Sequence, residues 1–173
     1  VTRTIPADGK FSAEEKAIYQ LVYDAQEAAF KTLRNGSKWA DAGKAAKEVI
    51  AEGLLNLGII KNKTEAGKYF PHGLGHHIGL DVHDRGTYDT LKKDMVITIE
   101  PGIYIPEGSP CDKKWWSIAV RIEDDLLITQ DNWKLPGQAG GQWEMLWEGR
   151  RPGDKQERYR LYHAEKAKGG MAL

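Results

Sequence analysis

The sequence predicts an α+β fold, with helices packed on one face of an antiparallel sheet. Two stretches between residues 12 and 58 carry apolar residues at helical spacing, which is typical of amphipathic helices. From about residue 70 onward, short runs rich in β-branched residues alternate with turn signals, which favours antiparallel strands. Helices followed by such strands are expected to form separate layers around one core.

Residues 1–11 are expected to end a strand and then turn, because β-favouring residues precede a proline and an Asp-Gly pair. Ser12 and Glu15 form a Ser-x-x-Glu capping box, which predicts the start of the first helix. The pair Asn35-Gly36 predicts the end of this segment. The apolar stripe of the helix consists of Ile18, Leu21, Val22, Ala25, Ala29 and Leu33.

The second helix is expected to begin at Ser37 or Asp41 and to end at Gly58. Its apolar stripe consists of Ala42, Ala45, Val49, Ile50, Leu54 and Leu57. The strands predicted after it cover residues 95–99, 102–105, 117–122 and 126–129. The turn signals that separate them lie at Pro101-Gly102, at residues 106–110 and at Asp124-Asp125.

The composition excludes several classes of partner. The 173 residues suffice for one ordinary domain, and 25 Lys and Arg residues balance 25 Asp and Glu residues. This balance provides no broad basic face, so we expect no nucleic-acid partner. No apolar run approaches the ~20 residues that a membrane helix requires, so we expect no membrane partner. Cys111 is the only cysteine, which excludes an intrachain disulfide and favours a reduced, cytoplasmic setting.

Four of the five histidines lie in the segment from His72 to Asp84, HGLGHHIGLDVHD. Neutral imidazole is a common ligand for transition metals and a common acid or base near neutral pH. His72 and His76 have the spacing of the HExxH zinc motif, but intervening glycines disfavour a helix and no Glu follows the first histidine. One histidine alone would most simply be structural, whereas four in a glycine-rich segment indicate a site.

Two carboxylates end otherwise apolar strands, Glu100 after residues 95–99 and Glu123 after residues 118–122. A carboxylate in such a place is costly to bury unless it is paired or bound to a metal. Simple exposure at a strand end is one alternative, and a salt bridge to Arg121 without any metal is another. Together with the histidines, the two carboxylates favour a divalent-metal site with oxygen and nitrogen ligands.

The motifs HGLGHHIGLDVHD, TIEPGIYIPE and VRIEDDLLIT, in this order, resemble the C-terminal catalytic domain of Xaa-Pro aminopeptidase (aminopeptidase P) and its relative prolidase. Residues 2–29 are similar to the same family's first long helix and the segment before it. The resemblance implies a pita-bread fold, in which two α+β halves share a curved antiparallel sheet with helices on its outer face. It implies a partial pita-bread catalytic domain over residues 1–133. Residues 134–173 are then a divergent tail, either a short helix or partly disordered.

The family binds two divalent ions through two Asp, one His and two Glu. The resemblance implies that His76, Glu100 and Glu123 are metal ligands, with Glu123 bridging the ions and Glu100 also moving a proton. The metal implied is Mn²⁺, with Co²⁺ and Zn²⁺ as alternatives.

The same resemblance assigns catalytic roles to residues around the ions. His72 and His83 are implied to contact the substrate and stabilise the tetrahedral intermediate, and Arg121 to organise the network. The implied reaction is hydrolysis of the bond before proline, in a peptide with proline at its second position, by a metal-activated water.

The family's second Asp ligand immediately precedes the segment that resembles Val1 to Thr4, and its first lies on an adjacent strand. We therefore expect this chain to be a fragment that lacks both Asp ligands, holds at most one weakly bound ion and is inactive alone. An exposed sheet edge would then favour a homo-oligomer. Asp94 is a smaller departure, because the family usually has Gly at that position.

Two alternatives stay open. One is a non-catalytic pita-bread module that binds proteins or peptides, although the presence of all these site residues argues against it. The other is a metal-free hydrolase of the creatinase type, against which both glutamates argue. The motifs do not separate aminopeptidase from dipeptidase specificity, although residues 114–125 favour aminopeptidase P.

Overall fold

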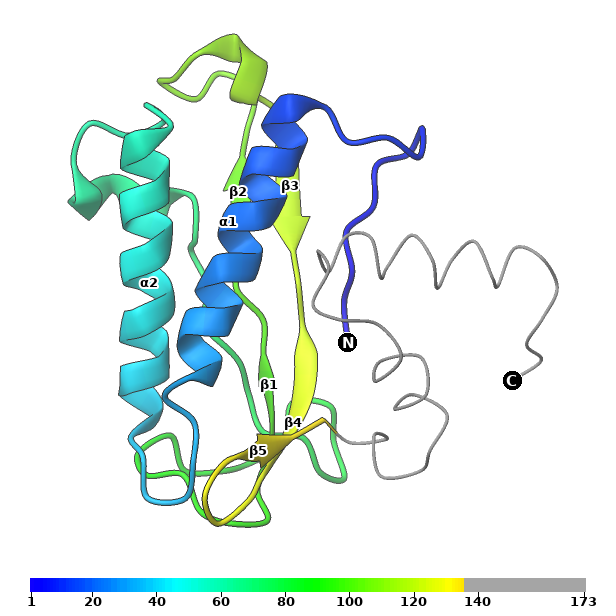
Figure 1. Ribbon diagram of the computed structural model, residues 1–173, viewed down its shortest axis with the longest axis vertical. Coiled ribbons are helices and arrows are strands. Elements are labelled where there is room, and N and C mark those ends of the chain that lie inside the picture. Colours follow the sequence, from blue (N-terminus) through cyan, green and yellow to red (C-terminus); the bar gives the residue numbers. More distant parts are fainter. Residues whose placement is uncertain (136–173) are drawn as a thin grey trace, which may run out of the picture. The chain divides into compact units, whose positions relative to one another are not determined.

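The computed structural model describes residues 1–135, so the predicted tail over 134–173 lies almost entirely outside the described residues. Helices α1 (Ala13–Phe30) and α2 (Trp39–Asn56) run side by side, as Figure 1 shows, and α1 packs against the strands. The 3-10 helices η1 (Lys63–Lys68) and η2 (Lys113–Trp115) lie in the connections. No helix in this part of the chain combines the length and the apolar character that a membrane crossing requires.

Two predicted helix signals are confirmed. The Ser12 hydroxyl accepts a hydrogen bond from Glu15 N at 3.1 Å, and the Glu15 carboxylate accepts one from Ser12 N at 2.8 Å. At the end of α2, Gly58 has a φ of 70° and its amide donates to the Leu55 carbonyl at 3.0 Å. The next amide donates to the Leu54 carbonyl at 2.9 Å, which completes a Schellman cap.

The end of α1 differs from the prediction, because the helix stops at Phe30 rather than near Asn35-Gly36. The amide and the hydroxyl of Thr32 both donate to the Ala29 carbonyl, at 3.0 and 2.8 Å, and this local bonding competes with the helical pattern. Leu33 is nevertheless buried, so the apolar stripe continues onto the core beyond the helix.

The strands are antiparallel, as predicted. Their bounds are β1 (Val96–Ile99), β2 (Gly102–Ile105), β3 (Ile118–Arg121), β4 (Asp124–Ile128) and β5 (Trp133–Lys134). Strand β1 pairs with β4, β4 pairs with β5, and β2 pairs with β3. The short β5 has no counterpart in the sequence prediction.

The prediction of a turn at Asp124-Asp125 is wrong, because both residues belong to β4. The buried Asp124 carboxylate faces the Arg3 guanidinium, which supplies the paired charge that an acidic residue inside a strand needs. The expectation that a strand ends near the start of the chain is confirmed in a minimal form. Thr2 makes an isolated antiparallel bridge with Glu123.

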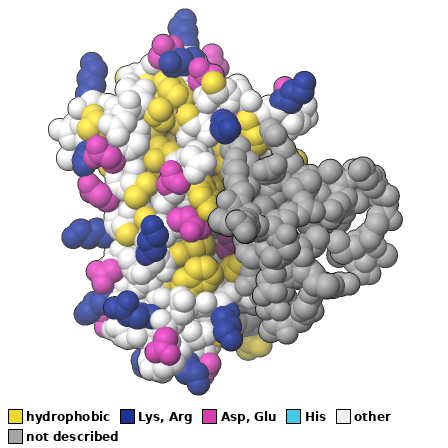
Figure 2. Space-filling model, viewed as in Figure 1, with side chains coloured by type: hydrophobic (Ala, Val, Ile, Leu, Met, Phe, Trp, Pro, Cys, Tyr) yellow, Lys and Arg dark blue, Asp and Glu magenta, His cyan; other side chains and the backbone are white. Residues whose placement is uncertain are grey.

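The core lies between the helices and the strands. The strands turn apolar side chains toward the helices, including the fully buried Ile97, Ile99 and Ile103. Helix α2 approaches α1 closely at Gly53, where an added Cβ would lie 2.2 Å from a methyl group of Leu21. On the face that Figure 2 shows, basic and acidic side chains are interspersed among apolar ones, and neither sign of charge dominates.

Candidate metal centre

The two predicted glutamates lie opposite each other in two short links, Glu100 between β1 and β2 and Glu123 between β3 and β4. Ile99 pairs with Asp124 and Gly102 pairs with Arg121, so the shared register places Glu100 opposite Glu123 and Pro101 opposite Ile122. Carboxylates facing each other in an antiparallel pair repel, which destabilises the sheet unless a cation compensates them. The register thus concentrates negative charge at one position, on the face away from the helices.

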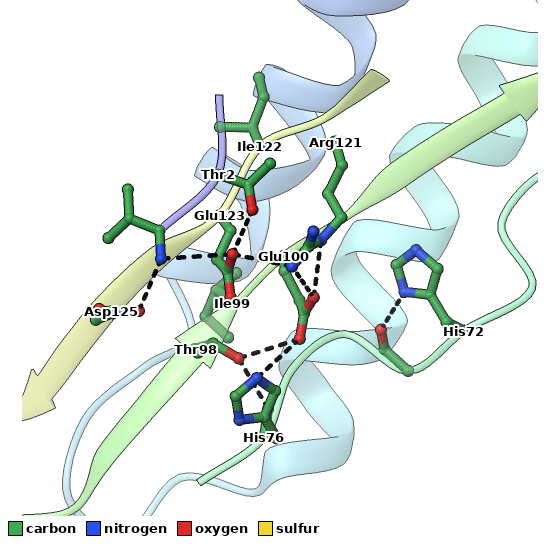
Figure 3. Close-up of polar contacts among 12 residues, drawn as sticks. Thr2, His72, His76, Thr98, Ile99, Glu100, Arg121, Ile122, Glu123 and Asp125 are labelled. Atoms are coloured by element: carbon green, nitrogen blue, oxygen red, sulfur yellow. Dashed lines mark hydrogen bonds and ion pairs between the residues drawn. The ribbon is translucent and has the colours of Figure 1, made fainter. Parts of the chain in front are cut away.

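Arg121 supplies part of the compensation. Its Nε and Nη2 both lie 2.9 Å from Oε2 of Glu100, and Nη2 also lies 2.9 Å from Oε2 of Glu123, as Figure 3 shows. The salt bridge considered as an alternative to a metal is therefore present. It uses Oε2 of each glutamate, and Oε1 of Glu100 turns toward His76 instead.

In its neutral form, His76 presents a nitrogen without a proton to the glutamates. Its Nδ1 lies 2.9 Å from the carbonyl oxygen of His77, and a carbonyl only accepts, so Nδ1 carries the proton of the neutral ring. Nε2 then has a lone pair and lies 3.4 Å from Oε1 of Glu100. Two acceptor atoms at this separation need a proton or a metal ion between them.

The Thr98 side chain connects His76 and Glu100 through hydrogen bonds. Its hydroxyl accepts a hydrogen bond from His76 N at 2.9 Å and donates to Oε1 of Glu100 at 3.3 Å. The backbone of Gly75 passes so close that an added Cβ would lie 1.9 Å from the Thr98 carbonyl oxygen. Glycine at this position is what allows the histidine segment to lie against β1.

The first residues of the chain border Glu123 on its other side. The Thr2 hydroxyl donates to Oε2 of Glu123 at 2.5 Å, and the Val1 nitrogen lies 3.5 Å from the same oxygen. Burial by itself raises the pKa of Glu123, but the Thr2 hydroxyl, the Val1 amino group and the Arg121 guanidinium outweigh burial. The pKa of Glu123 is therefore held below its ordinary value.

His83 lies beside His76, with ring centroids 4.4 Å apart and the planes nearly perpendicular. The loop that carries it is closed by Asp84, whose carboxylate accepts a hydrogen bond from Leu80 N at 3.0 Å. The Leu80 side chain at the tip of this loop is fully exposed.

His72 lies farther along the same segment and bonds a residue that the sequence analysis missed. Its Nε2 lies 2.7 Å from the hydroxyl of Tyr104 on β2, and its Nδ1 lies 2.8 Å from the Gly73 carbonyl. Burial has the largest effect on the pKa of Tyr104 and raises it. Arg121 lowers this pKa and Glu100 raises it, each by less than burial does. The period-2 alternation of β2, counted from Glu100, would have placed Tyr104 on this face.

His77 has a structural role, which the sequence analysis considered only for a histidine taken alone. It is 7% exposed, and its Nε2 lies 3.0 Å from the Thr87 carbonyl oxygen. Trp39 and Tyr88 pack around its ring, with centroids 5.8 and 5.0 Å away. These contacts direct the ring away from the glutamates.

The residues present fit a divalent cation. His76, Glu100 and Glu123 each offer a ligand atom, and these atoms lie within 4.8 Å of one another. One imidazole and two carboxylates suit Mn²⁺, Co²⁺ or Zn²⁺. The negative charge of the two carboxylates is met by the Arg121 guanidinium and, at Glu123, also by the Val1 amino group.

Comparisons with known proteins identify the family to which the chain belongs. Residues 1–130 match the model of metallopeptidase family M24. The Xaa-Pro aminopeptidase of Haemophilus influenzae is 41% identical in an alignment 142 residues long, which covers 75% of this chain and 33% of that protein. Xaa-Pro aminopeptidase 3 of Rattus norvegicus is 39% identical in an alignment 141 residues long, which covers 76% of this chain and 28% of that protein.

A solved structure of the aminopeptidase PepP of Pseudomonas aeruginosa superposes with a TM-score of 0.73 at 39% identity, over 77% of this chain and 33% of that one. The chain thus spans about a third of the length of the relatives it matches. The described residues adopt part of the pita-bread fold of these aminopeptidases. The chain belongs to metallopeptidase family M24.

Proposed function

We propose that the whole protein is an Xaa-Pro aminopeptidase, which hydrolyses the bond before proline in peptides with proline at the second position. The observation that carries the proposal is the group of His76, Glu100 and Glu123, with ligand atoms within 4.8 Å of one another. The names of the relatives in Haemophilus influenzae and Rattus norvegicus support the choice of substrate.

In this proposal His76, Glu100 and Glu123 hold the metal, and Glu100 also accepts and returns the proton of the attacking water. A bound divalent ion supplies Lewis acidity and lowers the pKa of that water. Arg121 keeps both carboxylates turned so that each retains an oxygen for the ion.

His83 is the donor to the developing oxyanion, because it stands beside the metal-binding histidine. His72 acts together with Tyr104 at the margin of the site, since both of its ring nitrogens already have partners.

We further propose that the chain of residues 1–173 holds at most one ion, weakly, and hydrolyses peptides slowly or not at all. Among residues 1–135 only this one group of three ligands is assembled. The two-ion centre implied by the resemblance needs more carboxylates than that. Mn²⁺ is the proposed metal, and an Escherichia coli aminopeptidase P has been solved in a Zn-substituted form with product.

The experiment is a titration of the metal-free chain with Mn²⁺, Co²⁺ and Zn²⁺ by calorimetry, together with an assay of X-Pro peptide cleavage. Wild type is expected to bind one ion, and His76→Ala and Glu100→Gln are expected to abolish binding. Glu107→Gln, an exposed glutamate outside the site, serves as the control.

The outcomes separate the proposals. No ion binding by wild type, or binding unchanged in both site variants, would refute the metal centre. Rapid cleavage by the 173-residue chain would refute the expected inactivity. If the gene encodes residues before Val1, the longer protein should cleave X-Pro peptides with added Mn²⁺, and inactivity there would favour the binding module. A homo-oligomer and a cytoplasmic setting stay predictions.

A further inference from the structure

A buried glutamine on α1 reaches the strands directly behind the two glutamates. Gln26 is 0% exposed, in a helix whose other buried positions are mostly apolar. Its side-chain Nε2 donates to the Ile99 carbonyl at 3.1 Å and lies 3.5 Å from the Ile122 carbonyl. These carbonyls belong to the residues that immediately precede Glu100 and Glu123.

The Ile122 carbonyl needs a donor because of the proline opposite it. Ile122 N donates to the Pro101 carbonyl at 3.3 Å, as in a regular antiparallel pair. The return bond would come from the amide of Pro101, but proline has no N–H. The amide of Gln26 lies where it replaces that missing donor, and an unsatisfied buried carbonyl would otherwise cost free energy.

The peptide plane that precedes each glutamate has polar contacts at both its carbonyl and its amide. In the Ile99–Glu100 plane, Gln26 bonds the carbonyl and Glu100 N donates to the Leu74 carbonyl at 2.7 Å. In the plane before Glu123, the same glutamine lies against the carbonyl and Glu123 N donates to the Thr2 carbonyl at 3.0 Å. Because a peptide unit is planar, bonds at its two ends fix the direction in which the next side chain departs.

We propose that Gln26 is a positioning residue for the metal centre, which holds the backbone of Glu100 and Glu123 at the spacing that one shared cation requires. The inference rests on the proposed function of these glutamates as ligands. Gln26 acts through the backbone from the core side, and the ligands meet the ion on the opposite face. A buried amide contacting both ligand-bearing strands would couple α1 packing to metal affinity.

The test compares Gln26→Leu and Gln26→Met with Gln20→Leu in the 173-residue chain. Gln20 lies on the same helix, where its amide bonds Asp24 at the surface, so this control makes the same chemical change outside the core. Affinity for Co²⁺ is measured by calorimetry. The NMR signal of the Arg121 Nε–H, which bonds Glu100 at 2.9 Å, reports the spacing of the glutamates without any metal.

Both Gln26 variants are expected to bind Co²⁺ about tenfold or more weakly, as is usual when support behind a metal ligand is removed. They are also expected to broaden or lose the Arg121 signal, while Gln20→Leu changes neither. Wild-type values of both quantities in folded Gln26→Met would overturn the proposal. If the wild-type chain binds no ion, the Arg121 signal alone tests the positioning role of Gln26. The lack of Co²⁺ binding then counts only against the proposed function of the site.

A double-mutant cycle distinguishes loss of the Gln26 hydrogen bond to the Ile122 carbonyl from a general loss of packing. Pro101→Ala restores a backbone N–H opposite the Ile122 carbonyl, so it should reduce the effect of Gln26→Leu on the Arg121 signal. The single Pro101→Ala variant provides the reference for the cycle. Strictly additive effects of the two substitutions would show that Gln26 does not replace the proline's missing donor, and would overturn that part of the proposal.

Discussion

The hydroxyl of Tyr104 lies 2.7 Å from Nε2 of His72, and this contact limits the hydrogen bonds that the histidine can offer to a substrate. The other ring nitrogen, Nδ1, lies 2.8 Å from the Gly73 carbonyl oxygen, which only accepts, so Nδ1 carries the proton. In the neutral ring Nε2 therefore accepts from the Tyr104 hydroxyl. No N–H of His72 then remains for a substrate, which favours His83 as the donor to the oxyanion.

We expect long-range ¹H–¹⁵N NMR spectra to find neutral His72 in the Nδ1–H form. In Tyr104→Phe, Nε2 should keep its lone pair but move toward the chemical shift of a nitrogen without a hydrogen bond. His77 is an internal control, because its Nε2 lies 3.0 Å from the Thr87 carbonyl and should carry the proton. A proton on Nε2 of neutral His72 in wild type would contradict the assignment.

Gly75→Ala is expected to disrupt the site, because the new Cβ would lie 1.9 Å from the Thr98 carbonyl oxygen. Backbone cannot move aside as a flexible side chain can, so we expect a loss of about 1–3 kcal/mol in the free energy of unfolding. Gly73→Ala is the matched control, since an added Cβ there meets nothing within 4 Å. Urea denaturation of both variants measures the difference, and equal losses would argue against a close approach at Gly75.

Asp94→Gly is expected to stabilise the protein by about 0.5–1 kcal/mol, because Asp94 has a φ of 71°, a conformation that favours glycine. The resemblance to aminopeptidase P had marked this position as one where Gly is usual. Lys93→Gly, at a neighbouring residue without a positive φ, should instead destabilise. Thermal unfolding of the two variants provides the test, and a lower Tm for Asp94→Gly would refute the strain.

The lowered pKa of Glu123 predicts how stability depends on pH. The folded state favours the ionised carboxylate, so its contribution is fully present above the ordinary pKa of about 4.3. It is lost as the pH falls through the lower pKa of the folded state. Urea denaturation between about pH 3 and pH 8 should therefore give a shallower decline on the acid side for Glu123→Gln than for wild type. Glu107→Gln should follow the wild-type curve, and identical curves for all three proteins would contradict the prediction.

The elements that local chemistry determines could be predicted from the sequence. The Ser12 capping box and the Gly58 helix end need only residues a few positions apart, and both are present. The turn expected at Asp124-Asp125 is wrong for the opposite reason. Arg3, far away in the sequence, pairs with Asp124 and makes a strand tolerable there.

The candidate site depends on long-range pairing to a greater extent. His76 and Glu100 were singled out as residues, but their 3.4 Å approach depends on how the histidine segment lies against β1. Tyr104 and Gln26 were missed because an aromatic residue in a strand and a polar residue in a helix are ordinary features by themselves. Their roles follow from partners 32 and 73 positions away. The assignment of individual roles stays a prediction.

The placement of Glu100 opposite Glu123 also bears on how this hairpin tolerates insertions. Strand pairing on both sides of the two glutamates fixes their register, so the connection between β2 and β3 has no part in aligning them. The loop at its exposed residues 106–108 can then be lengthened or shortened while Glu100 stays opposite Glu123. A single residue inserted between Arg121 and Glu123 would instead turn these two side chains toward different faces of the sheet. The tip of the hairpin thus tolerates changes in length, whereas one residue inserted at its centre would disrupt the site.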